Sequence, residues 1–287
     1  MNSILYSMRR KMQVLAFDIF GPKFMSKVYF RIVLKQKLNL KEPKTFNEKI
    51  QWYKLNTCHQ DERIIICSDK LRVREYLDKK GLLEYQVPLL GDWESTDQIE
   101  WDKLPQRFVI KCNHGCAYNI ICKDKSEIDL SKVERKLTRW LNESFGKFNA
   151  EIHYDKIKPC ILCEEYLDND GLPLVDYKIH CFNGVPKFIL ICSEREGNKS
   201  NYNYYDLNWD RLDYSTTLTK DFKKPDTFSK MLEISKIIAE DFPFVRVDFY
   251  DIKGKLMIGE LTFVPAGGLD DTLPKKADLE IGNMLNL

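Results

Sequence analysis

One stretch decides how the rest of the chain is interpreted: Phe244-Val-Arg-Val-Asp-Phe-Tyr-Asp-Ile-Lys-Gly-Lys-Leu-Met-Ile-Gly-Glu-Leu-Thr-Phe263. Its first half alternates apolar side chains with Arg246 and Asp248, which is the period of a strand with one packed face and one polar face. A turn signal at 251–254 then reverses the chain, and the return strand brings Glu260 back beside Asp248. The stretch therefore predicts a β-hairpin with carboxylates on neighbouring strands.

The charges on this hairpin have two interpretations. Facing carboxylates repel unless a cation lies between them, and Mg²⁺ usually takes one or two protein carboxylates together with water and phosphate oxygens. Asp248 and Glu260 are therefore candidate Mg²⁺ ligands. Arg246 lies on the same face as Asp248, where its charge could stabilise a phosphoryl group in transfer. The same pattern also fits a surface hairpin with ordinary charges on its wet face, and the upstream sequence has to decide.

Length and composition are typical of a globular protein without a nucleic-acid partner. The 287 residues could form one large domain or two to three smaller ones, and 44% of them are hydrophobic and 31% charged. A formal net charge of +2 gives no global reason to expect nucleic acid. No stretch reaches the length of a transmembrane helix, and residues 9–20 do not make a convincing signal peptide. We expect a cytoplasmic protein.

The nine cysteines are spread through apolar runs, as buried thiols are in a reducing compartment. Cys160-Ile-Leu-Cys163 fits the spacing of a redox or metal pair, but its middle is apolar and strand-like. We interpret these two cysteines as core thiols.

The first 56 residues are strongly basic. They hold 12 Lys and Arg against three acidic residues, so this segment carries +9 and the remainder −7. Apolar residues recur at helical spacing on both sides of Gly21-Pro22, which predicts two helices broken at that point. A basic amphipathic start can lie on an anionic membrane surface, dock on a partner, or cap the fold with one solvated face; the cap is the simpler expectation.

Two helix starts carry capping signals. Thr45 precedes an apolar run, and Glu48 stands where its side chain can reach back, which predicts a capping box. Ser68 precedes a second helical run, and we expect it to begin that helix in the same way.

Residues 107–122 predict a strand, a turn of small residues and a return strand. The first strand delivers Lys111, and the turn at Asn113-His114-Gly115 has little bulk, so its backbone N–H groups could approach phosphate oxygens. Hairpins that carry a lysine are common, and this signal is weak alone. By itself, His114 is interpreted as a hydrogen-bonding loop residue rather than a catalytic base.

Together these motifs run in the order and approximate spacing of an ATP-grasp enzyme. The chain resembles the TupA-like ATP-grasp family, which is associated with bacterial teichuronopeptide and other cell-surface polysaccharide biosynthesis. The resemblance covers nearly the whole chain from about residue 29 onward. Its most specific pieces are Lys44-Thr-Phe-Asn-Glu-Lys-Ile-Gln-Trp52, Phe108-Val-Ile-Lys-Cys-Asn-His-Gly115, Asn119-Ile-Ile-Cys122, Asp176-Tyr-Lys178, Phe244-Val-Arg-Val-Asp-Phe249 and Gly259-Glu-Leu-Thr-Phe263.

The resemblance implies an α+β ATP-grasp fold, in which two α+β subdomains clamp a nucleotide behind a helical N-terminal extension. The domains that we predict are a basic helical extension at 1–60, an N-terminal α/β subdomain at 61–105, a lid subdomain at 106–165 and a C-terminal catalytic subdomain at 166–287.

It also implies how ATP is bound. Lys70 and Lys111 would hold the α and β phosphates, and the loop from Asn113 to Asn119, with His114 and Gly115, would close over them. Glu164 and Glu165 would meet adenine and ribose at the hinge. The loop here, Gly115-Cys-Ala117, is less rich in serine and glycine than is usual in the family.

The remaining roles concern catalysis and the metal. Lys178 would reach the adenine or phosphate edge, and Arg246 would stabilise the transferred phosphate. Asp248, Glu260 and Thr262 would hold Mg²⁺. Many ATP-grasp enzymes carry Asn where this chain has Thr262, so a hydroxyl or a water would take that place here.

The implied reaction joins a carboxylate to an amine. ATP would phosphorylate the carboxylate to an acyl phosphate, which the amine attacks to give an amide, ADP and phosphate. The expected substrates are a uronic acid of a capsule or other cell-envelope polysaccharide and an amino acid or amine, with polysaccharide-synthesis enzymes at the inner membrane surface as partners. Three alternatives stay open: a kinase acting on a sugar hydroxyl, a glycosyltransferase-type protein that binds a sugar nucleotide, and a non-catalytic ATP-binding partner of a membrane assembly.

Overall fold

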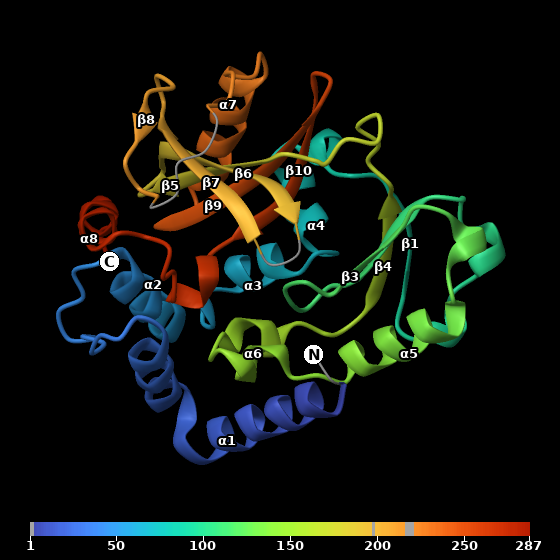
Figure 1. Cartoon of the computed structure of the whole chain (residues 1–287), viewed down its shortest axis with the longest axis horizontal. Helices are drawn as coiled ribbons and strands as arrows, with labels where there is room; N and C mark the ends of the chain where they lie inside the picture. Colours follow the sequence, from blue (N-terminus) through green and yellow to red (C-terminus); the bar gives the residue numbers. More distant parts are fainter. Residues whose placement is uncertain (1–2, 197–198, 216–220) are drawn as a thin grey trace. The chain divides into compact units, whose positions relative to one another are not determined.

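Two antiparallel sheets, one of four strands and one of six, organise the computed structural model, which describes residues 3–196, 199–215 and 221–287 (Figure 1). Each sheet belongs to a different unit. Unit 1 comprises Met1–Met25, Cys58–Tyr76 and Val87–Leu167, and unit 2 comprises Ser26–Thr57, Leu77–Gln86 and Asp168–Leu287. An N-terminal helix followed along the chain by further helices and antiparallel strands confirms the predicted α+β class.

The predicted domain boundaries stay predictions. Each unit is assembled from separate stretches of sequence. Residues 1–2 of the predicted extension, and residues 197–198 and 216–220 of the predicted catalytic subdomain, lie outside the described residues.

Unit 1 is built on the sheet of order β1-β4-β2-β3. Its strands are β1 (Leu89–Trp93), β2 (Phe108–Cys112), β3 (Asn119–Cys122) and β4 (Ile161–Glu165). Its helices are the first part of α1 (Ser3–Val33), α3 (Glu62–Ser68), α5 (Leu130–Leu141) and α6 (Phe145–Phe148). Short 3₁₀ turns lie at Thr96–Gln98, Trp101–Lys103, Lys125–Glu127 and Ile152–Lys156.

The core of unit 1 lies between β2 and the helices α5 and α6. The side chain of Asp129 caps α5 by accepting from the N–H of Lys132 at 3.0 Å. The buried side of the helix carries Leu137 and Trp140, which pack with Phe108 and other apolar side chains of the sheet. This packing holds the sheet edge from which the loop at 113–118 starts.

Unit 2 is built on the sheet of order β10-β9-β5-β6-β7-β8. Its strands are β5 (Asp176–Phe182), β6 (Val185–Glu196), β7 (Lys199–Asp206), β8 (Arg211–Leu212), β9 (Phe244–Ile252) and β10 (Lys255–Thr262). Its helices are α2 (Phe46–Tyr53), α7 (Phe228–Ala239) and α8 (Lys275–Met284), with 3₁₀ turns at Leu83–Tyr85 and Pro265–Gly268. Three elements contain a sequence boundary between the units: α1, a π-helical turn at Lys54–Cys58 and α4 (Val73–Lys79).

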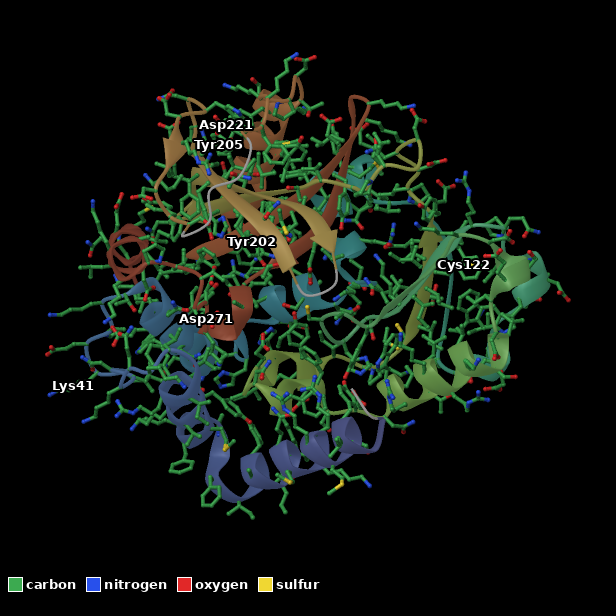
Figure 2. All side chains as sticks on the ribbon, in the orientation of Figure 1. Lys41, Cys122, Tyr202, Tyr205, Asp221 and Asp271 are labelled. Atoms are coloured by element: carbon green, nitrogen blue, oxygen red, sulfur yellow. The ribbon has the colours of Figure 1, made fainter. Side chains whose placement is uncertain are left out.

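The side chain of Tyr205 ties β7 of the unit 2 sheet to the segment before α7. Tyr205 donates from its hydroxyl to Asp221 at 3.4 Å, and both residues are labelled in Figure 2. The N–H of Phe222 donates back to the hydroxyl of Tyr205 at 2.9 Å. These bonds hold the segment before α7 against β7.

The predicted hairpin is confirmed, and its register depends on a bulge. Asp248 in β9 is paired with Glu260 in β10, whereas Phe249 is paired with Ile258. Gly259 is therefore the extra residue on β10. A Cβ atom on Gly259 would come within 2.7 Å of the Tyr250 ring, so the close approach of the strands needs glycine.

The kink and the capping box are confirmed. Gly21 has φ 76° inside α1, next to Pro22. Thr45 accepts from the N–H of Glu48 at 3.3 Å, and Glu48 accepts from the N–H of Thr45 at 3.2 Å.

The prediction for Ser68 is wrong, because this residue ends α3. The next residue, Asp69, accepts from the N–H groups of Leu71 and Arg72 at 2.8 and 3.2 Å. An aspartate so placed satisfies the donors of the turn before α4, and serine is not needed there.

Cys160 and Cys163 are free thiols, and burial raises the pKa of each to about 12. They stay protonated near neutral pH, as expected of core thiols. None of the helices in the described ranges combines the length and apolar character that crossing a bilayer requires.

Candidate functional site

Unit 1 places one buried carboxylate between two cations. Lys111 in β2 is opposite Leu162, and Val109 is opposite Glu164 in β4, so Lys111 and Glu164 are diagonal neighbours on one face of the sheet. Lys111 forms an ion pair with Glu164. Arg74 donates to the other oxygen of Glu164 at 3.1 Å and to the carbonyl of Val87 at 2.5 Å. Glu164 is only 5% exposed, and this geometry fixes the direction of the Lys111 side chain.

The loop after β2 is held by a lysine from a different segment. Lys70 donates from Nζ to the carbonyl oxygen of Gly115 at 2.6 Å. A Cβ atom on Gly115 would come within 2.8 Å of the Phe145 ring and 2.9 Å of the Tyr118 ring. Two of the predicted phosphate-binding residues, Lys70 and Gly115, are thus brought together, and the path of the loop requires glycine.

Asn113 anchors the start of this loop. Its amide nitrogen donates to Asp69 at 3.0 Å and to the carbonyl of Lys158 at 2.9 Å. Its amide oxygen accepts from the N–H of Cys160 at 2.8 Å. A buried amide with these partners holds the loop to β4 and to the turn that carries Lys70.

His114 belongs to this loop, and its side chain is buried against α5. Its Nε2 is 3.1 Å from the carbonyl oxygen of Trp140 in α5, and its ring contacts Tyr118 edge-on. Burial lowers the pKa of His114, and the hydrogen bonds to backbone oppose this only partly. The imidazole is therefore neutral near pH 7.

Asn119 and Glu165 stand apart from these contacts. Asn119 is exposed on β3 opposite Lys111, and Glu165 is exposed on β4 opposite Phe108. Glu165 faces away from Glu164 because successive residues of a strand point to opposite sides. The predicted roles of both residues stay predictions.

Unit 2 also places one buried carboxylate between two cations. Asp248 accepts from Arg246 through both oxygens, from Nε at 2.6 Å and from Nη2 at 2.7 Å. Lys178 in β5 donates to Asp248 at 2.5 Å, since the two residues face each other in register. Arg246 also donates to the hydroxyl of Thr262 at 3.1 Å. Four of the predicted site residues therefore meet in one cluster.

Two more carboxylates adjoin this cluster. Glu260 is the register partner of Asp248 across the bulge. Asp176 lies 3.6 Å from Nζ of Lys178 and is 4% exposed. Its spacing of two from Lys178 on a strand is the sequence signal that could have assigned it to the site.

These neighbours shift the pKa values of the cluster. Burial alone would raise the pKa of Asp248, but the charges and hydrogen bonds of Arg246 and Lys178 outweigh burial and lower the pKa to about 2. For Arg246 the effects have the opposite sign: burial alone would lower its pKa, but the charge of Asp248 outweighs burial and raises the pKa. Both groups are ionised at neutral pH.

The donor set suits a cation that also takes ligands from elsewhere. Within 3–196, 199–215 and 221–287, no three His, Cys, Asp or Glu side chains converge as a metal cage would require. Mg²⁺ needs only one or two carboxylates when phosphate oxygens complete its shell. Both oxygens of Asp248 accept from Arg246 and Lys178, and the metal role of Asp248 and Glu260 stays a prediction. The hydroxyl of Thr262 accepts from Arg246, and its role as a metal ligand stays a prediction.

Sequence reasoning missed three further residues of these clusters. Arg74 and Asp69 support Glu164 and Asn113 from segments that are distant in sequence. His180, paired in register with Arg246, stacks on Phe188 with ring centres 4.4 Å apart. No motif of the sequence marks these contacts.

Comparison with protein families decides the assignment. The TupA-like ATPgrasp family profile matches residues 48–286. The chain belongs to the TupA-like ATP-grasp family. This membership confirms the resemblance drawn from the motifs and the ATP-grasp fold that it implied.

Several solved structures of ligases are similar to this chain, at low sequence identity. D-alanine–D-alanine ligase from Bacillus anthracis complexed with ATP is 14% identical, with a TM-score of 0.45 over 76% of this chain and 68% of that one. L-amino acid ligase from Bacillus licheniformis is 14% identical, with a TM-score of 0.45 over 73% of this chain and 43% of that one. Phosphoribosylamine–glycine ligase from Thermotoga maritima is 14% identical, with a TM-score of 0.45 over 70% of this chain and 48% of that one. Likenesses of this size assign no substrate. Comparison with curated proteins finds no match.

Proposed function

We propose that this protein is an ATP- and Mg²⁺-dependent ligase that joins a carboxylate to an amine through an acyl phosphate and releases ADP. Membership of the TupA-like ATP-grasp family supports the use of ATP. A reaction of this kind depends on positioning and charge neutralisation and needs no covalent nucleophile from the protein.

The observation that carries the proposal is the opposite charge balance of the two clusters. In unit 1, Lys111 and Arg74 share the single carboxylate of Glu164. In unit 2, Lys178 and Arg246 adjoin three carboxylates, those of Asp176, Asp248 and Glu260. The first cluster has the surplus cation that phosphate binding needs, and the second has the surplus carboxylate that a divalent cation needs.

Individual residues follow from this balance. Lys70 and Lys111 would bind phosphate oxygens, and Asp248 and Glu260 would hold Mg²⁺, which neutralises phosphate charge when bound. Arg246 donates to Asp248 through Nε and Nη2. The N–H groups of its Nη1 would then be directed at the transferred phosphoryl group.

The proposed acceptor is a uronic acid of a bacterial surface polysaccharide, and the donor is an amino acid or amine. The support for this choice is the setting associated with the family. The residues above support the nucleotide end of the proposal, and the family association supports the acceptor end.

The first test is calorimetric titration with ADP, with and without Mg²⁺. Lys111→Ala should weaken ADP binding about 10- to 100-fold in both conditions, because it removes a charge-assisted bond to phosphate. Glu260→Gln should weaken ADP binding only when Mg²⁺ is present. The matched controls are Lys158→Ala in unit 1 and Glu233→Gln in unit 2, whose ion pairs are exposed.

Other results would overturn the assignment. Binding of a uridine sugar nucleotide that neither Lys111→Ala nor Glu260→Gln alters would favour the glycosyltransferase-type alternative and a purely structural hairpin. ADP binding that Glu260→Gln weakens equally without Mg²⁺ would remove the proposed metal role.

The second test traps the intermediate. Incubation with ATP, Mg²⁺, hydroxylamine and a panel of uronic acids should yield a hydroxamate, since hydroxylamine intercepts an acyl phosphate. A phosphorylated sugar that mass spectrometry detects as the end product would instead identify a kinase. ATP turnover without hydroxamate from any carboxylate would contradict the ligase proposal.

A further inference from the structure

Within unit 1, the first part of α1 lies beside α6 (Figure 1) and contacts α5 and α6. Gln13 donates to the carbonyl of Phe148 in α6 at 3.0 Å, and the Arg10 guanidinium lies 3.9 Å from the centre of the Phe148 ring. The guanidinium of Arg139 in α5 lies 5.3 Å from the Tyr6 ring. These contacts fix which side of the helix is turned away from the unit.

The opposite face carries a continuous apolar stripe. Its members are spaced alternately three and four residues apart, and each is more than half exposed: Leu5 (61%), Met8 (54%), Met12 (65%), Leu15 (60%) and Ile19 (63%). At 100° per residue this spacing confines the side chains to an arc of roughly 80°. We name these residues the N-terminal apolar stripe. Exposure of this much aligned apolar surface marks an interaction site.

Basic residues border the stripe on both sides. Arg9 and Lys11 are exposed and lie on its two flanks by helical position. The acidic residue of this helix, Asp18, forms an ion pair with Lys147 at 2.6 Å. Positive charge therefore flanks the apolar surface, and the one opposing charge is already paired.

The apolar and basic character continues past the kink. Phe20 and Phe24 are 56% and 48% exposed, and their ring centres are 4.9 Å apart across Gly21. Lys23 between them is exposed. Aromatic side chains beside lysine are the residues that amphipathic helices place at a membrane interface.

These features distinguish between possible occupants. The stripe spans residues 5–19, about two heptads, whereas a coiled coil needs about three to four. Parallel pairing with a second copy would also bring Arg9 and Lys11 against like charges. Although α1 spans 31 residues, the part of it that the structure describes is not apolar enough to cross a bilayer.

We propose that the N-terminal apolar stripe lies in the interface of an anionic membrane, parallel to its surface. Leu5, Met8, Met12, Leu15 and Ile19 enter the boundary between headgroups and acyl chains, and Arg9 and Lys11 contact lipid phosphates. This inference is independent of the ligase reaction.

The test is flotation of the full chain with vesicles of phosphatidylcholine alone and with vesicles that also contain phosphatidylglycerol. The wild-type protein should float with the anionic vesicles and should dissociate as salt rises. Met12→Ser with Leu15→Ser and Ile19→Ser should weaken binding roughly 100-fold, because three apolar side chains no longer leave water. Arg9→Glu with Lys11→Glu should weaken it about tenfold or more.

Matched controls separate the stripe from general changes in charge and polarity. Lys275→Glu with Lys276→Glu on α8 changes the net charge equally, and Leu172→Ser removes an equally exposed apolar side chain from a turn of unit 2. Both control variants should bind as the wild type does. Circular dichroism of each variant confirms that it is folded.

Three outcomes would overturn the proposal. The first is no flotation of the wild type with anionic vesicles. The second is flotation that survives the triple serine variant. The third is a dimer in light scattering that the triple variant dissociates, which would make a second copy of the chain the occupant.

Discussion

Both units bury one carboxylate between a lysine and an arginine, but they differ in what surrounds that arrangement. Glu164 in unit 1 is shared by Lys111 and Arg74, whose side chains are 19% and 15% exposed. Asp248 in unit 2 is shared by Lys178 and Arg246, whose side chains are 10% and 15% exposed. The second cluster also has two further carboxylates beside it, those of Asp176 and Glu260.

The difference shows how one local arrangement can end up with opposite net charge. A lysine and an arginine on a buried carboxylate leave a net positive charge; one additional carboxylate neutralises it, and a second makes the cluster negative. In unit 2, the strand register and the bulge at Gly259 supply the additional acids. The net charge of each cluster therefore comes from the neighbours of the ion pair rather than from the pair itself.

The largest effect should follow Asp248→Asn. This change leaves Arg246 and Lys178 without the carboxylate that they share, and Asp176 and Glu260 offset only part of the loss. We expect the free energy of unfolding to fall by about 3 kcal/mol in urea titrations and ATP turnover to be lost. Asp226→Asn, on an exposed residue, is the control. If the free energy of unfolding of the Asp248 variant is unchanged, water replaces Asp248 as the partner of Arg246 and Lys178, and the prediction is wrong.

A smaller loss should follow Glu164→Gln in unit 1. Lys111 and Arg74 remain partly accessible to water, so we expect about 2 kcal/mol in the free energy of unfolding. Glu165→Gln, next along the strand and exposed, should leave unfolding unchanged. If Glu164→Gln destabilises the protein more than Asp248→Asn does, the comparison of the two clusters is wrong.

The pH dependence of stability compares the buried histidines of the two units. Burial, assisted by the charge of Arg246, lowers the pKa of His180 to about 3. An unfolded histidine takes up a proton near pH 6.5, so between pH 6.5 and 3 the unfolded chain binds a proton that the folded chain does not. His180 therefore makes the protein less stable as pH falls, by about 1.4 kcal/mol per pH unit at most.

His180→Phe should flatten this dependence. The measurement is urea unfolding at a series of pH values from 7 to 5, for the wild type, His180→Phe and His114→Phe. Burial lowers the pKa of His114 as well, so that variant should change the slope in the same direction. Equal slopes in the wild type and in His180→Phe would show that His180 is protonated in the folded protein.

The smallest effect should follow Lys158→Ala. Lys158 pairs with Glu94 on the surface of unit 1, where the two side chains are 76% and 68% exposed. Water and salt screen such a pair, so urea unfolding should not change measurably. A clear loss of stability here would mean that ion pairs in unit 1 do not follow burial, and the comparison of Glu164 with Asp248 would lose its basis.

The sequence predicted local features of the fold well. The alternation of Arg246 and Asp248 with apolar residues predicted β9, and the spacing to Glu260 predicted its partner, because strand period and turn chemistry act over a few residues. The capping box of Thr45 and Glu48 is local in the same way. Ser68 was misassigned because Asp69 competes for the same N–H groups from the next position.

Contacts between distant segments were less accessible. Glu164 lies 90 positions from Arg74, and Asp248 lies 70 positions from Lys178. Asp248 was assigned to the site from the hairpin pattern, Lys178 only through resemblance to the family, and Arg74 was missed. No periodic pattern connects such pairs, since their contact depends on which strands and helices become neighbours.

By itself, the sequence determined the α+β class, the hairpin with its carboxylates and the order of motifs that marks the TupA-like ATP-grasp family. These are properties of periodicity and spacing along the chain. Only the tertiary structure decided that Asp176 joins Asp248 and Glu260, that Arg74 shares Glu164, and that the apolar stripe of α1 faces outward. The physical reason is that strand register, burial and the choice of packed helix face are set by contacts between segments that fold together.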